Sequence, residues 1–202
     1  MPIAKTRPPK QSVAKLRSAL AQLAPVKESR KRWMRIHPGI IGPSHILYPH
    51  PIYSVRLLDL IAGQALGPTL RRVGWMYFLR NPEAQLACAE VSIVARKHTG
   101  VRLSEGPFAR NVFRIIQKVR NDPRLRRRQF ELRSVRAESL HAFALWLRAS
   151  ANNEFWILVT PIGDTVAPMQ WLTRKAFADL LVKEAGRVAA AQERAKLLVK
   201  GA

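Results

Sequence analysis

Two apolar runs joined by a short polar loop decide the fold expected for this chain: HAFALWLRASANNEFWILVTP, residues 141–161. In the first run, Phe143, Leu145 and Leu147 alternate with other residues, which is the two-residue period of a strand. The second run, 155–161, is equally apolar, and the polar residues 149–154 are typical of a hairpin loop. We therefore predict an antiparallel strand pair here, with a helix over 138–149 as the alternative.

Further strands are expected on the N-terminal side of this pair. Residues 73–80 alternate, with Trp75, Tyr77 and Leu79 on one face, and residues 129–136 alternate as well. Residues 84–94 fit either a hairpin partner or a helix, and their β-branched ending favours the strand. The chain thus provides about five candidate strands.

Helical spacing predicts four helices, over 12–23, 54–66, 107–121 and 171–199. The clearest begins at Pro107 and carries one apolar stripe, formed by Phe108, Val112, Ile115, Ile116 and Val119. The segment 54–66 is apolar nearly all round, which predicts a buried helix. Four prolines and two glycines in residues 37–51 predict an irregular loop there.

These elements predict an α+β fold, with a mainly antiparallel sheet of four to five strands packed by helices. We expect one domain over residues 37–202, preceded by a basic extension, residues 1–36, that holds a short amphipathic helix. Five aromatic side chains are expected to be buried: Trp75, Phe113, Trp146, Trp156 and Phe177.

Charge is distributed very unevenly along the chain. There are 35 Lys and Arg against 13 Asp and Glu, a net charge of +22. Residues 1–36 contain 10 basic residues and 1 acidic residue, residues 96–136 contain 13 basic and 3 acidic, and these two segments hold +19 of the total. Such segregation is typical of a binding site for a polyanion.

The helix over 107–121 carries the first candidate site. Opposite its apolar stripe, Arg110, Arg114 and Lys118 recur every four residues, so they stand about 6 Å apart along one face. The charge continues past the helix through Arg120, Arg124, Arg126, Arg127 and Arg128. We predict that these cations bind nucleic-acid phosphates; the alternative is a solvated helix face followed by a basic loop.

A second candidate site lies in the N-terminal segment, where Arg30, Lys31 and Arg32 precede Trp33. An aromatic ring beside cations can stack on exposed bases. The alternative is that Trp33 packs onto the domain instead.

No motif in the chain fixes a reaction. The sequence contains no Gly-x-Ser-x-Gly, no Gly-rich phosphate loop and no His-Glu-x-x-His. The spacing of His37, His45 and His50 fits no metal-binding cassette, so neither a metal nor a cofactor is expected. Cys88 is the single cysteine and cannot form an internal disulfide.

The sequence therefore predicts a non-enzymatic protein that binds a polyanion, most simply nucleic acid without strong sequence preference. Two alternatives stay open: a subunit that assembles with an acidic protein partner, and an enzyme with a pocket lined by the histidine loop. No apolar run reaches the roughly 18 residues of a transmembrane helix. We expect a soluble, cytoplasmic protein whose basic N-terminus is a tail rather than a transit peptide.

Overall fold

The computed structural model describes residues 2–4, 6–23, 46–80, 86–150, 152–162 and 169–200, without the side chains of Leu23 and of residues 196–200. Its strands are β1 (Ile46–Val55), β2 (Leu70–Arg80), β3 (Leu86–Val94), β4 (Lys97–Ser104), β5 (Glu131–Ala137), β6 (Ala142–Ser150), β7 (Asn153–Leu158) and β8 (Trp171–Leu172). Its helices are α1 (Lys10–Leu23), α2 (Leu57–Ile61), α3 (Leu66–Thr69), α4 (Pro107–Asn121) and α5 (Arg174–Lys200), and two 3-10 turns cover Pro123–Leu125 and Glu138–Leu140.

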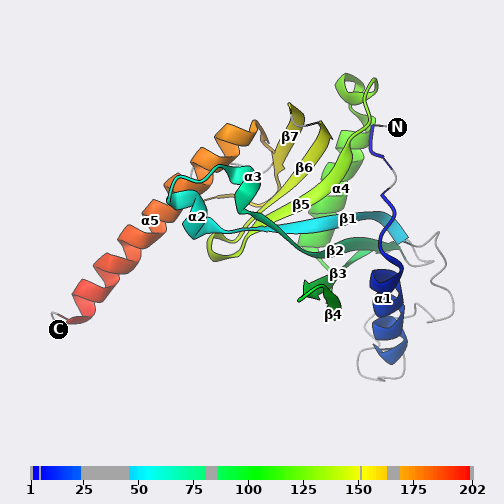
Figure 1. Cartoon of the computed structure of the whole chain (residues 1–202), viewed down its shortest axis with the longest axis horizontal. Coiled ribbons are helices and arrows are strands. Elements are labelled where there is room, and N and C mark those ends of the chain that lie inside the picture. Colours follow the sequence, from blue (N-terminus) through cyan, green and yellow to red (C-terminus); the bar gives the residue numbers. More distant parts are fainter. Residues whose placement is uncertain are drawn as a thin grey trace. The chain divides into compact units, whose positions relative to one another are not determined.

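The fold is α+β with a mixed, mainly antiparallel sheet, as predicted (Figure 1). The described strands follow the order β4-β3-β2-β1-β5-β6-β7-β8, so the expected four to five strands were too few. The chain divides into two compact units: unit 1 comprises Met1–Ile52 and Arg72–Ser134, and unit 2 comprises Tyr53–Arg71 and Val135–Ala202. The boundaries between them fall inside β1, β2 and β5.

In unit 1, α1 covers one face of β2 and β3. The predicted alternation in β2 is confirmed, because Trp75, Tyr77 and Leu79 share a buried cluster with Leu16 and Leu20 of α1. The Tyr77 hydroxyl also donates a hydrogen bond of 2.6 Å to the Ser12 hydroxyl, which is buried. These contacts anchor a helix that would be marginal alone in water.

Helix α4 packs on the opposite face of the same strands. Its predicted bounds are confirmed, and its inner face is buried at Ala109, Val112, Ile115, Ile116 and Val119. Phe78 of β2 meets Phe113 of α4 with ring centroids 5.5 Å apart. Phe113 was expected to be buried but is only half-buried, because it lies at the flank of the apolar stripe.

Strand β4 was missed because neither its composition nor its turn has a strong strand signature. It pairs with β3 through a tight turn in which Ala95 and Arg96 have φ of 47° and 65°. Such left-handed turns usually contain Asn or Gly, so Ala-Arg gave no turn signal. The pairing of β3 itself with β2 confirms the strand interpretation of residues 84–94 for its described part, Leu86–Val94.

The prediction of an irregular loop over 37–51 was wrong for its last six residues, since β1 begins at Ile46. Prolines at positions 49 and 51 are compatible with a strand because alternate residues point their N–H groups to the same side. The two missing donors therefore fall on one edge of β1, and the other edge keeps every N–H group. Residues 37–45 lie outside the described part of the chain.

The helix expected over 54–66 is also corrected. β1 continues to Val55, and only Leu57–Ile61 is helical before Gly63, at φ 87°, ends the turn. The segment is not buried as a whole, because Leu58 is 81% exposed. The apolar composition of residues 54–66 thus predicted a long buried helix, but only a short helix forms there.

In unit 2 the predicted hairpin over 141–161 is confirmed. β6 and β7 pair antiparallel with Trp146 opposite Trp156, and the two indoles stack with centroids 4.9 Å apart. Phe177 of α5 stacks on Trp156 at 4.8 Å, which fixes the helix on this hairpin. The predicted start of α5 at residue 171 was too early, because Trp171 and Leu172 form β8 against β7.

The C-terminal half of α5 leaves the core. Phe177, Leu181 and Ala185 are buried, whereas Ala195 is exposed. Figure 1 shows this half of the helix running beyond the strands of unit 2.

Gly74 occupies a position in β2 where a side chain would not fit. A Cβ atom there would lie 2.7 Å from the carbonyl oxygen of Val91, next to the irregularity in the β3–β4 register. We expect Gly74→Ala to lower the free energy of unfolding by about 1–3 kcal/mol, measured by urea denaturation. Gly100→Ala is the matched control, because nothing lies within 4 Å of its Cβ position; equal losses in both variants would contradict the steric explanation.

Candidate functional site

The outer face of α4 carries the predicted cations. Arg110, Arg114 and Lys118 are all exposed, opposite the buried stripe of the helix. The Arg114 Nη2 donates a hydrogen bond of 2.7 Å to the side-chain oxygen of Asn111, which orients the guanidinium without neutralising it. Helix α4 therefore presents three charges at four-residue spacing.

Two of the predicted arginines are engaged within the protein. Arg120 is half-buried and donates through Nη1 to the Tyr48 hydroxyl at 2.9 Å, and Gln117 donates to the same oxygen at 3.0 Å. Arg124 forms an ion pair with Asp122 at 2.6 Å. The hydrogen bonds from Arg124 hold the pKa of the Asp122 carboxyl below its usual range. These two arginines are less suited to a ligand than the sequence indicated.

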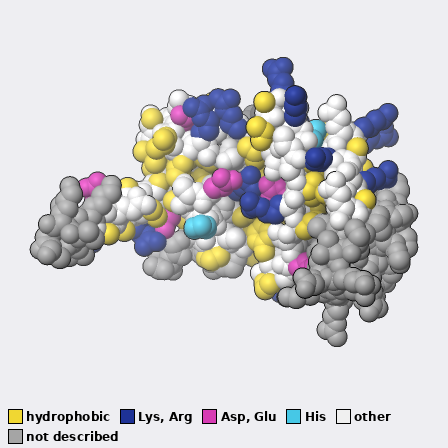
Figure 2. All heavy atoms as spheres, turned by 90° about the horizontal axis from the view of Figure 1, so that it is seen from below, with side chains coloured by type: hydrophobic (Ala, Val, Ile, Leu, Met, Phe, Trp, Pro, Cys, Tyr) yellow, Lys and Arg dark blue, Asp and Glu magenta, His cyan; other side chains and the backbone are white. Residues whose placement is uncertain are grey.

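The remaining cations follow Arg124 directly. Arg126, Arg127 and Arg128 are exposed, and neither they nor Arg110 has an ion pair with any residue the structure describes. We call Arg110, Arg114, Lys118, Arg126, Arg127 and Arg128 the basic surface. One face of the molecule, drawn in Figure 2, shows Lys and Arg side chains in several separate groups, some of them beside acidic side chains.

The beginning of the chain lies beside the end of this basic run. Ile3 pairs in parallel with Phe130, whose N–H donates to the Pro2 carbonyl at 2.7 Å and whose carbonyl accepts from the Ala4 N–H at 2.9 Å. No local pattern indicated this pairing, since it joins segments more than 120 residues apart. It places the first residues of one basic segment next to the other. Arg30, Lys31, Arg32 and Trp33, the second candidate site, lie outside the described residues.

His50 does not support the alternative of an enzyme whose pocket is lined by the histidine loop. Its ring is fully buried and stacks on Phe78, Nδ1 donates to the Tyr48 carbonyl at 2.6 Å, and Nε2 accepts from the Ser134 hydroxyl at 2.7 Å. Burial lowers the pKa of His50 to about 4. A neutral imidazole with both nitrogens satisfied has a structural role. His37 and His45 lie outside the described part of the chain.

Other chemical groups within the described ranges are equally inert. Burial raises the pKa of the Cys88 thiol to about 12, so a reactive thiolate does not form at neutral pH. Among the described residues no three His, Cys, Asp or Glu side chains gather as a metal site would need.

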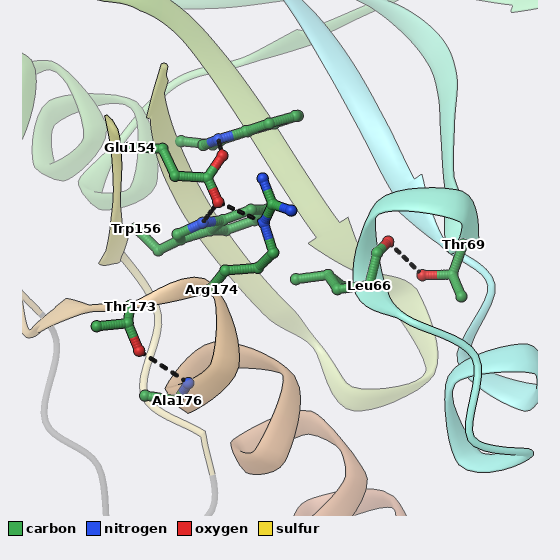
Figure 3. A network of polar contacts seen from close by, with 8 residues as sticks. Leu66, Thr69, Glu154, Trp156, Thr173, Arg174 and Ala176 are labelled. Carbon is green, nitrogen blue, oxygen red and sulfur yellow. Dashed lines mark hydrogen bonds and ion pairs between the residues drawn. The ribbon is translucent and has the colours of Figure 1, made fainter. Parts of the chain in front are cut away.

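A buried carboxylate that the sequence did not single out organises unit 2 (Figure 3). Glu154 accepts hydrogen bonds from the indole N–H groups of Trp146 at 2.9 Å and Trp156 at 3.2 Å, and from Arg174 Nε at 2.5 Å. Burial raises the pKa of this carboxyl, but the bonds from Arg174 and the two indoles outweigh it and lower the pKa overall. Thr173 accepts from the Ala176 N–H and caps the helix that carries Arg174.

Protonation of His50 should destabilise the protein in acid. The folded-state pKa of about 4 lies below the ordinary 6.5, so the unfolded chain binds the proton more tightly. This contribution to stability is complete above pH 6.5 and declines toward pH 4, by about 3 kcal/mol. Urea unfolding between pH 4 and 7.5 should show a shallower pH dependence in His50→Gln than in wild type. His141→Gln, at an exposed position, is the control; identical profiles for all three proteins would contradict the assignment.

Removing the charge of Glu154 should destabilise unit 2. Glu154→Gln retains the size of the side chain but loses the ion pair with Arg174 and places an amide group beside donors. We expect the free energy of unfolding to fall by about 1–3 kcal/mol in thermal or urea denaturation. Glu193→Gln, on an exposed position of α5, should change stability by less than about 0.5 kcal/mol. A Glu154→Gln protein as stable as this control would show that the network is dispensable.

Comparison with known proteins assigns no function to these residues. No protein-family model, no curated protein and no solved structure matches the chain. Across the described residues, none of the helices has both the length and the apolar character needed to cross a membrane.

Proposed function

We propose that unit 1 is a non-enzymatic binding module for a polyanion, most simply nucleic acid without strong sequence preference. One observation carries this proposal: unit 1 contains 24 basic and 6 acidic residues, whereas unit 2 contains 11 basic and 7 acidic residues. Unit 1 thus holds +18 of the net +22. An electrostatic field of one sign attracts an extended anion from a distance and holds it through many weak contacts.

The basic surface would supply those contacts. Arg110, Arg114 and Lys118 follow one another at about 6 Å along α4, close to twice the 3.4 Å rise per phosphate along one duplex strand. Arg126, Arg127 and Arg128 extend the row beyond the helix. Each cation that meets a phosphate releases a condensed counterion, which is the main source of affinity in sequence-independent binding.

We expect the binding to show weak preference for nucleic-acid sequence, because most amide side chains of α4 are engaged within the protein. Asn and Gln side chains are the usual readers of adenine edges. Of the three amides on this helix, Gln117 donates to Tyr48 and Asn111 accepts from Arg114, so both are already engaged. The exposed groups that remain are chiefly cations, which contact phosphates and carry little sequence information.

The N-terminal segment would act as a second arm in this proposal. Residues 1–36 form the predicted basic extension, with Arg30, Lys31, Arg32 and Trp33 as its contact residues. The pairing of Ile3 with Phe130 supports this arrangement, because it starts the segment beside the basic surface. A single buried cysteine is compatible with the cytoplasm, where we place the binding.

The salt dependence of binding tests the proposal. Six contacting cations predict a slope of log K against log salt concentration of about −5 on duplex DNA. The triple variant Arg110→Gln, Arg114→Gln and Lys118→Gln should flatten this slope by about 2.7 and leave the melting temperature nearly unchanged, because the positions are exposed and Gln suits a helix. The measurement is a fluorescence-anisotropy titration at several salt concentrations.

A control variant that loses the same number of charges elsewhere distinguishes the effect of the basic surface from the effect of net charge. Lys175→Gln, Lys183→Gln and Arg194→Gln remove three exposed cations from α5 and should keep the wild-type slope. Equal slopes in the wild type and the α4 variant would overturn the role of the basic surface. Tighter binding of poly-L-glutamate than of DNA or RNA at equal charge would instead favour the acidic protein partner.

A further inference from the structure

A pocket in unit 1 stands apart from the basic surface in its chemistry. It has a volume of about 500 Å³ and lies between the N-terminal part of α1 and the beginning of β1. This volume is in the range of sites that enclose a small molecule rather than a polymer. The basic surface includes none of its residues, whereas two of them, Val13 and Ile46, also pack against the buried cluster of α1, β2 and β3.

The charged residues among the described lining of the pocket are cationic. Arg7, Lys10 and Arg17 line it, and none of the other described lining residues is acidic. All three side chains are exposed, and none of them has an ion pair with another described residue. Three exposed cations around one small volume favour an anionic group in it.

The rest of the lining is aliphatic. Val13 and Ala14 of α1 and Ile46 of β1 contribute to it, together with Pro8 and Pro49. None of the described lining residues is aromatic, so they offer a nucleobase no stacking partner. An alkyl chain, in contrast, gains free energy from each methylene that leaves water.

We infer that this pocket binds a single-chain anionic amphiphile, in which an alkyl chain contacts the aliphatic residues and a terminal phosphate contacts the three cations. The pocket uses none of the residues of the basic surface, although its three cations belong to the basic extension, residues 1–36. The same chemistry occurs in a free alkyl phosphate and in a membrane phospholipid. The limited volume favours the free molecule with one chain.

Isothermal titration calorimetry with octyl phosphate, below its micelle-forming concentration, tests the inference. We expect binding of one molecule per chain. Inorganic phosphate lacks the chain and octyl glucoside lacks the charge, so each should bind at least tenfold more weakly. Vesicles that contain phosphatidic acid form a separate arm, in which the protein should not bind in preference to free octyl phosphate.

Two variants address the two halves of the pocket. Ala14→Trp places bulk into the pocket from an exposed helix position, and should abolish binding without loss of helical circular dichroism. Arg7→Gln, Lys10→Gln and Arg17→Gln together should weaken octyl phosphate at least tenfold and leave octyl glucoside unchanged. Lys15→Gln is the matched control, since Lys15 is exposed on the same helix but does not line the pocket.

The outcomes separate this inference from the proposed function. The Arg110, Arg114 and Lys118 triple variant should bind octyl phosphate like wild type, whatever its affinity for DNA. Equal affinity for octyl phosphate and octyl glucoside would overturn the role of the cations. Unchanged binding in Ala14→Trp, or binding only to vesicles, would overturn the pocket as the site.

Discussion

The structure depends on one constraint: a positive charge is too costly to bury without a partner. No Lys or Arg among the described residues is buried, although the chain has 35 of them. The buried positions of the strands and helices are therefore built mainly from neutral side chains. The described cations lie at exposed or half-buried positions of helices, turns and strands, including β2, β4 and β5. With only 13 acidic residues in the chain, one-to-one ion pairs can neutralise only a minority of the 35 Lys and Arg.

The same constraint applies to the buried titratable groups, which are either neutral or compensated by partners. His50 stays neutral, with both ring nitrogens bonded to Tyr48 and Ser134. Glu154 keeps its charge because Arg174 and two indole N–H groups replace the lost water. His50 in unit 1 and Glu154 in unit 2 are thus each held in a defined ionisation state. Their pKa values are both lowered, and both groups favour the native state more as pH rises from acid toward neutrality.

The two units differ in their charge and in the side chains that form their cores. Unit 2 combines an aromatic stack with a nearly balanced set of charges, and its cations on α5 are partly paired, as in the contacts of Lys175 with Asp179 and Arg187 with Glu184. Unit 1 carries the excess charge in two different settings. On α4 and the segment after it, the cations stand on an open surface suited to a polymer of phosphates. At α1, three cations surround an aliphatic pocket suited to one small amphiphile.

The sequence by itself determined the elements whose signal is local. Alternation in residues 141–161 predicted the hairpin, and the apolar stripe of 107–121 predicted α4. Burial of one face imposes a period on the order of apolar residues, which can be read from the sequence. The exposure of Arg110, Arg114 and Lys118 followed from the same stripe. Only the tertiary structure decided the rest. β4 pairs with the adjacent β3 through an Ala-Arg turn that gives no turn signal, and Arg124 pairs with Asp122 two residues away. Contacts between segments distant in the sequence decide three further features: β1 with its two prolines, the bridge from Ile3 to Phe130, and the contact of Arg120 with Tyr48. Such contacts leave no periodic pattern in the residues that make them.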